Sequence, residues 1–193
     1  MVCLQLNLFS NLINLKLLCA GNNVKNTLQN RLVPKKVEVF ILRVRKGRIP
    51  VRMELDKNGI DLHLVRCPLC DDGIESVVHC LYGCNKVSDV WNKVFEWWGL
   101  KGSTIVNLEE LLLGNSSQVN SVEGKNIWQA MIWSCVYLMW KNRNHAIFNN
   151  VSWNPPVALS EIQVKSYEWI AKRIKGKSIN WYNWLHCPNI FVS

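Results

Sequence analysis

The sequence predicts a mainly α-helical protein, with short helices around a small cysteine- and histidine-containing knuckle and a Trp-rich helical region after it. Apolar residues recur at three- and four-residue spacing in several segments, and no alternating apolar run of useful length indicates a strand. With 193 residues, 49% hydrophobic and 19% charged, the chain has enough apolar sequence to form a core and lacks the composition of a highly charged disordered chain.

Two short helices are predicted before the knuckle. The first follows Pro34 and ends at Gly47, because its apolar residues recur at helical spacing: Val37, Phe40, Ile41 and Val44. The second runs from Val51 to Asn58, between Pro50 and Gly59, since proline favours a helix start and glycine a helix end. A basic turn joins the two.

The helices after the knuckle are predicted from apolar periodicity and from the breaks between them, over residues 87–98, 108–113, 126–148 and 160–174. The first of these has an aromatic face and ends at Gly99. Ser160 and Gln163 match a capping-box pattern, which places the start of the last helix there, after a break at residues 149–156.

We divide the chain into three segments: an N-terminal extension (1–30), a knuckle-containing module (31–99) and a helical C-terminal region (100–193). The most apolar stretch, Ile127 to Trp140, is too short to span a bilayer, which needs about 20 apolar residues. The first 20 residues have no basic residue before Lys16, unlike a signal peptide. We therefore expect an intracellular protein, nuclear or cytoplasmic, with no membrane partner.

Four of the eight cysteines fall within 18 residues, at Cys67, Cys70, Cys80 and Cys84. Cys67-Pro-Leu-Cys70 places two thiolates on one tight turn, and His79 and Cys84 follow it. Structural zinc takes four nitrogen or sulfur ligands in a tetrahedron, often as a C-x2-C pair plus a second pair. The spacing therefore predicts a Cys3His zinc centre of Cys67, Cys70, His79 and Cys84, with no open coordination position.

Other uses of these residues stay open. Cys80 or His63 could replace His79 as the fourth ligand, although adjacent residues rarely point at one metal, which favours a buried thiol at Cys80. Cys67 and Cys70 also match the dithiol of thiol redox proteins, but that use needs a βαβ setting that this sequence does not indicate.

The charge of +9 favours polyanionic partners, so RNA or DNA is the expected partner. The densest basic run could contact phosphates: Arg43, Arg45, Lys46, Arg48 and Arg52. A second basic group comprises Lys172, Arg173, Lys175 and Lys177. The alternative for both is a solvated helix face. The ten tryptophans recur at helical spacing with aliphatic residues, which favours core packing over stacking on bases.

A series of motifs in residues 31–99 resembles the reverse transcriptase zinc-binding domain of plant LINE-type non-LTR retrotransposons. These are Val33-Pro-Lys-Lys-Val-Glu-Val-Phe40, Gly47-Arg-Ile-Pro50, Cys67-Pro-Leu-Cys70, Glu75-Ser-Val-Val-His79, Cys84 and Val90-Trp91. Trp140-Lys-Asn-Arg-Asn144 and Phe148 resemble the segment that commonly follows. One departure is Ile41-Leu42 before Arg43, where the family usually has a Trp-Arg pair after the phenylalanine.

The resemblance implies that Cys67, Cys70, His79 and Cys84 are the metal ligands of an accessory module that follows the polymerase, an RNA-directed DNA polymerase, in the parent element. A polymerase centre needs a paired-aspartate motif and a further aspartate for two metals, whereas the one adjacent pair here, Asp71-Asp72, lies in the zinc turn. We expect no catalytic centre and no small-molecule substrate. Residues 1–30 do not resemble what precedes the module, which indicates a truncated element or an incomplete gene model. A redox or protein-interaction module is the alternative function.

Overall fold

The computed structural model describes residues 29–100, 107–114, 119 and 121–192, so the predicted extension, 1–30, lies almost wholly outside the described part. The mainly α-helical prediction is confirmed. In chain order the described helical elements are α2 (Lys35–Arg45), α3 (Arg52–Lys57), the π-helix η1 (His79–Gly83), α4 (Asn85–Trp97), α5 (Leu108–Leu113), α6 (Val122–Phe148), α7 (Pro155–Arg173), α8 (Trp181–His186) and the 3-10 helix η2 (Pro188–Phe191).

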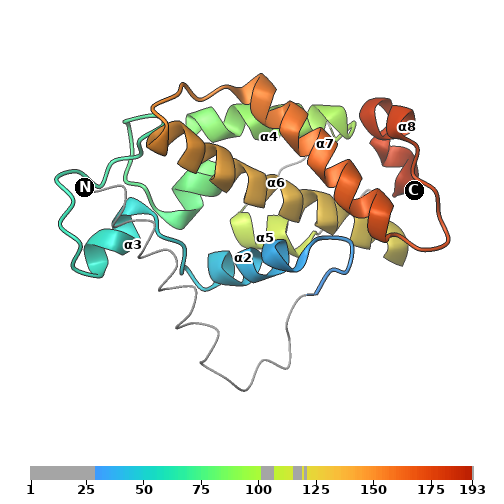
Figure 1. Cartoon of the computed structure of the whole chain (residues 1–193), viewed down its shortest axis with the longest axis horizontal. Coiled ribbons are helices and arrows are strands. Elements are labelled where there is room, and N and C mark those ends of the chain that lie inside the picture. Colours follow the sequence, from blue (N-terminus) through green and yellow to red (C-terminus); the bar gives the residue numbers. More distant parts are fainter. Residues whose placement is uncertain (1–28, 101–106, 115–118, 120, 193) are drawn as a thin grey trace, which may run out of the picture.

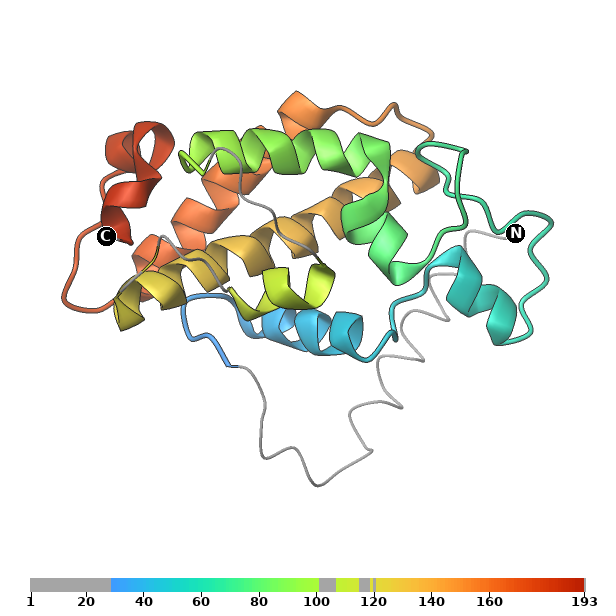
Figure 2. The ribbon, with the colours of Figure 1, turned by 180° about the vertical axis from the view of Figure 1, so that it is seen from behind.

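Helix α6 lies at the centre of the fold. Helices α2 and α5 lie along one side of it, and α7 and α4 lie along the other (Figures 1 and 2). Its residues from Ala130 to Val136 are buried on every face, as expected of a helix covered on all sides. The other helices need only one apolar stripe, because each has a single face toward the core.

The apolar stripes predicted for α2 and α4 are confirmed. The buried residues of α2 include Val37, Phe40, Ile41 and Val44, and those of α4 are Val87, Val90, Trp91 and Val94. Six of the ten tryptophans are buried, which confirms the core-packing prediction for most of them: Trp91, Trp98, Trp128, Trp133, Trp140 and Trp184. The rings of Trp98 and Trp128 meet edge to face with their centroids 5.0 Å apart.

Two predicted helix starts are wrong. Helix α6 begins at Val122, because the Ser121 hydroxyl caps it by accepting the Gly124 N–H at 3.0 Å. Helix α7 begins at Pro155, and its cap is Asn154. Ser160 does not cap this helix; its hydroxyl donates to the Pro156 carbonyl inside it. An asparagine side chain can cap the start of a helix, and a proline after it favours the first helical turn. A Ser-x-x-Gln pattern also fits a helix interior.

None of the helices in the described ranges combines the length and the apolarity that a bilayer crossing requires.

Candidate metal centre

A tight turn brings Cys67 and Cys70 together. The Asp71 N–H donates to the Cys67 carbonyl at 2.8 Å, and Asp71 takes a left-handed conformation with φ of 56°, which aspartate tolerates better than most residues. Arg66 and Ile74 form an isolated antiparallel bridge that closes the turn. The tight turn predicted for Cys67-Pro-Leu-Cys70 is therefore present.

The second pair of residues comes from the π-helix η1 and the helix after it. His79 is the first residue of η1, and its N–H donates to the Ser76 hydroxyl at 3.1 Å. The Cys84 N–H donates to the His79 carbonyl at 2.8 Å, and Cys84 is the N-cap of α4. The wide π turn thus holds His79 and Cys84 on the same side of the chain, facing the cysteine turn. Such turns are frequent at functional sites.

The four predicted residues lie together, with one ligand atom from each within 4.8 Å of all the others. The sulfurs of Cys67 and Cys84 are 3.9 Å apart, and Cys70 Sγ is 3.3 Å from His79 Nε2. Tetrahedral zinc with ordinary bond lengths requires edges of about 3.8 Å between sulfurs and about 3.6 Å between sulfur and nitrogen. The donor set and its spacing therefore fit a zinc ion.

The electrostatic surroundings favour a thiolate at Cys67, next to the Cys84 thiol. Contact with the Cys84 thiol, together with the Cys70 and Leu69 amides, outweighs burial and lowers the pKa of Cys67 to about 4. The same contact, together with burial, raises the pKa of Cys84. The amides of Lys86 and Val87, in the first turn of α4, act in the opposite direction on Cys84, because a helix N-terminus stabilises negative charge. Without a cation, the two sulfurs can therefore hold one negative charge between them.

Gly73 lies against the ring of His79. A methyl group at Gly73 would approach His79 Cε1 to 3.0 Å and Nδ1 to 3.2 Å, closer than nine in ten real contacts of this kind. The absence of a side chain at position 73 therefore lets the imidazole lie over the cysteine turn.

Cys80 and His63, the alternative fourth ligands, lie outside the cluster. Cys80 is 2% exposed, and burial raises the pKa of its thiol, as expected of a neutral sulfur in the core. His63 is exposed. The geometry places His79 with the three cysteines, and its role as a metal ligand stays a prediction.

A buried ion pair next to the knuckle was not predicted from the sequence. Glu75 is 0% exposed, and its carboxylate accepts hydrogen bonds from Arg143 Nε at 2.8 Å and from Arg143 Nη2. The same carboxylate accepts the Arg52 N–H at 2.9 Å. Both residues lie in motifs that carried the family resemblance, but their separation of 68 positions gives no local signal that they pair.

The five residues of the predicted basic run lie at the end of α2, in the loop after it and at the start of α3 (Figure 2). Arg45 forms an ion pair with Glu109, and Arg52 donates to the Arg66 carbonyl. Lys46 and Arg48 are exposed, and no carboxylate of the described residues lies within ion-pair distance of either. These two are the cations of the run most available to a phosphate.

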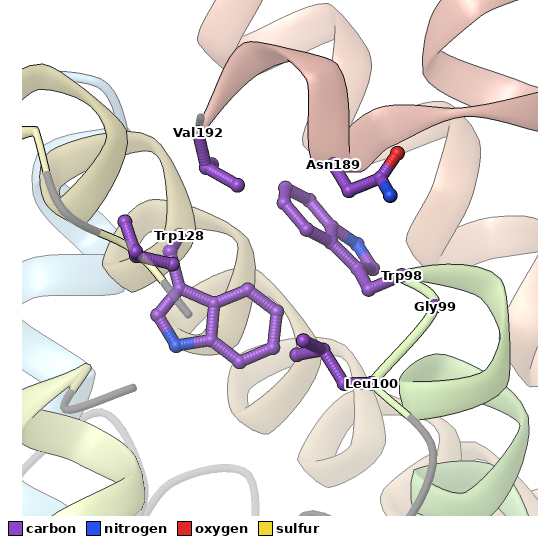
Figure 3. Close-up of a pocket in the computed structure, with 7 residues that line it drawn as sticks. Trp98, Gly99, Leu100, Trp128, Asn189 and Val192 are labelled. Atoms are coloured by element: carbon purple, nitrogen blue, oxygen red, sulfur yellow. The ribbon is translucent and has the colours of Figure 1, made fainter. Parts of the chain in front are cut away.

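A cavity of about 170 Å³ lies away from the knuckle, at the end of α4 (Figure 3). Its lining within the described residues is Trp98, Gly99, Leu100, Val119, Trp128, Asn189 and Val192. None of these seven side chains can act as an acid, a base or a nucleophile at neutral pH, so the cavity gives no basis for assigning a reaction.

Comparison with known proteins agrees with the geometry. Residues 14–91 match the family described as zinc-binding in reverse transcriptase, and the match includes all four residues of the cluster. No curated protein and no solved structure matches the chain significantly. The sequence match and the Cys3His cluster together fit a zinc-binding domain of the kind found in reverse transcriptases.

Proposed function

We propose that a structural zinc ion, held by Cys67, Cys70, His79 and Cys84, fixes the knuckle against the helices around it. The observation that supports this most directly is the cluster of four donors within 4.8 Å of one another. Four protein ligands leave no position for a water, so the ion would hold the fold and would not activate a nucleophile. Its binding free energy would contribute to folding.

Elemental analysis of the purified chain tests this proposal. We expect one zinc per chain, and we expect Cys70→Ala to lose it, because three remaining ligands leave the coordination shell open. Cys187→Ala is the matched control, since Cys187 is an exposed thiol outside the cluster. A metal-free wild-type protein prepared under reducing conditions with zinc present would refute the proposal.

We further propose that the chain is an accessory module of a retrotransposon reverse transcriptase polyprotein, of the LINE type, with no catalytic centre of its own. It associates with RNA or DNA through the basic run, with Lys46 and Arg48 as the main phosphate contacts. The support is the charge of +9 and the exposure of these two cations. Phosphate neutralisation needs only positive groups on one face, so it requires no pocket.

The salt dependence of binding tests the nucleic-acid proposal. Affinity for single strands should fall with salt at a slope of about −0.7 per neutralised phosphate, and Arg48→Glu should reduce that slope. Lys93→Glu is the matched control, because it makes the same charge change at an exposed position of α4 outside the basic run. Equal effects of the two substitutions would show that only net charge matters and would refute the assignment of this run.

The thiol redox alternative has little structural support. A redox dithiol needs an accessible thiolate, commonly at a helix N-terminus. Cys67 is 1% exposed and lies in a turn, and the sulfur that shifts its pKa most belongs to Cys84.

A protein-docking role is supported by one observation. Three apolar side chains of the knuckle segment are more than half exposed: Leu64 at 62%, Ile74 at 58% and Val78 at 53%. All three lie within residues 64–78, and a contiguous exposed apolar patch is typical of a docking surface. Tight binding to a protein partner that is insensitive to salt, with no affinity for nucleic acid, would favour this alternative.

A further inference from the structure

The C-terminal part of the chain combines positive charge with exposed aromatic rings. From Trp169 to Ser193 the sequence contains no aspartate or glutamate, and it contains Lys172, Arg173, Lys175 and Lys177. The cations lie at the end of α7 and in the loop that leads to α8, so both basic and aromatic residues lie at one end of the molecule (Figure 1).

Helix α8 is anchored to α7 by its inner face. Trp184 is 0% exposed, and its Nε1–H donates to the Gln163 carbonyl at 3.2 Å. Trp181 packs edge to face on Tyr167, with ring centroids 5.0 Å apart. These contacts fix the rotation of α8 about its own axis and therefore determine which residues face outward.

The outward face of α8 carries a stacked aromatic pair. Tyr182 is 67% exposed, and its ring stacks on that of the exposed His186 with centroids 4.4 Å apart and an interplanar angle of 25°. The Nδ1 atom of His186 lies 3.0 Å from the Tyr182 carbonyl, which restrains the imidazole. The pair contributes little to the core, because neither ring is buried. Its rings are instead arranged as a platform open to solvent.

The cations at this end of the molecule differ in whether they have a partner. Lys177 is 3.9 Å from Glu123, and Arg173 donates to the Trp169 carbonyl. The other acid nearby, Glu168, is paired with Lys165. Lys172 and Lys175 are exposed, and neither has a carboxylate of the described residues within ion-pair distance.

We propose that this C-terminal face, Lys172, Lys175, Tyr182 and His186, binds single-stranded nucleic acid, with a base stacked on the tyrosine–histidine pair and phosphates on the lysines. Proteins that bind single strands combine positive charge along the backbone with aromatic rings for unpaired bases. A duplex cannot use this platform, because its bases are already stacked on one another. The inference rests on the proposed nucleic-acid association and adds a second contact surface to it.

The two basic regions should differ in which nucleic acids they bind. The run from Arg43 to Arg52 contains no aromatic residue, so it can neutralise phosphates of single strands and duplexes alike. The C-terminal face can stack unpaired bases as well. A preference of the chain for single strands would therefore come from the C-terminal face.

The test uses the full zinc-loaded chain and fluorescence anisotropy with a labelled oligothymidine of 20 nucleotides and a labelled 20-base-pair duplex. Tyr182→Ala should weaken single-strand binding roughly 5- to 140-fold, the range that loss of one stacked base gives, and leave duplex binding unchanged. Tyr182→Phe should retain binding, because it keeps the ring. Phe148→Ala is the control for loss of an exposed ring, since Phe148 is 49% exposed at the far end of α6.

The outcomes test the C-terminal face and the nucleic-acid proposal separately. If Tyr182→Ala binds the single strand like wild type while Arg48→Glu weakens it, the C-terminal face is refuted and the nucleic-acid proposal stands. If Tyr182→Ala weakens single strand and duplex equally, or Tyr182→Phe fails like Tyr182→Ala, stacking is refuted. If the folded wild-type chain binds neither probe at low salt, both proposals fall.

Discussion

The ion pair between Glu75 and Arg143 should be one of the most sensitive points of the fold. It connects the knuckle segment to α6, and the side chains of its two partners are 0% and 7% exposed. The Arg143 guanidinium also lies 5.0 Å from the centre of the Trp140 ring. Removing the cation by Arg143→Met, which roughly keeps the side-chain volume, tests the contribution of this connection.

The structure sets the size of the expected effect. Arg143→Met removes both guanidinium hydrogen bonds to the Glu75 carboxylate and leaves the one that the Arg52 N–H donates. Hydrogen bonds to a charged group contribute about 1.5–3 kcal/mol each, and breaking a buried pair on one side costs about 3–5 kcal/mol. We therefore expect the free energy of unfolding to fall by about 3–5 kcal/mol, a large part of the total for a domain of this size.

Urea unfolding of the zinc-loaded chain, followed by circular dichroism, measures this loss. Arg45→Met is the control, because it removes an ion pair with Glu109 whose side chains are 30% and 50% exposed and should cost about 1 kcal/mol or less. The double variant Glu75→Met, Arg143→Met should be more stable than Arg143→Met alone, since it leaves no uncompensated buried charge. A loss in Arg143→Met no larger than in Arg45→Met, or a double variant that shows the sum of the two single losses, would refute the reasoning.

Three further predictions concern metal binding in the knuckle. Cys84→Ala should abolish tight zinc binding, whereas Cys80→Ala should retain the metal. Cys80→Ala should only lower the free energy of unfolding, by about 1–3 kcal/mol, because it leaves a small cavity. Equal zinc loss in the two variants, measured by elemental analysis, would overturn the ligand assignment. Gly73→Ala should weaken zinc binding in a chelator competition, because its methyl group would displace the His79 ring. Gly83→Ala is the control and should not weaken it, because the nearest atom to the added methyl group is 3.8 Å away. Equal zinc affinities of the two variants would contradict this prediction. A chelator should reduce the helical circular dichroism signal of the knuckle and its flanking helices, and an unchanged signal counts against a structural metal.

The sequence predicted those parts of the fold whose cause is local. The apolar spacing in α2 and α4 and the leucine-rich segment of α5 each determine a helix and its buried face, and all three are confirmed. The C-x2-C turn with His79 and Cys84 likewise predicted the cluster, because its ligands lie close together in the chain.

The parts that were missed depend on distant residues. Helix α8 is only six residues long, and its position is determined by contacts of Trp181 and Trp184 with α7, which periodicity cannot indicate. The pairing of Glu75 with Arg143 joins segments 68 residues apart. A charged residue in a helical pattern is usually solvated, so no local pattern indicates that this arginine lies in the core.

A bound zinc ion and the Glu75–Arg143 ion pair would have different structural roles. A zinc ion would fix the four ligands relative to one another, all of them between Cys67 and Cys84. The position of that unit on the rest of the protein depends on other contacts: Leu81, 0% exposed, is part of the same hydrophobic core as α6, and Glu75 holds Arg143. The described core is continuous from Val33 to Val192, across the boundary drawn after residue 99, whose role as a domain boundary stays a prediction. Because Glu75 lies only four residues before His79, we expect that loss of a bound metal would also weaken the contact of this segment with Arg143 of α6.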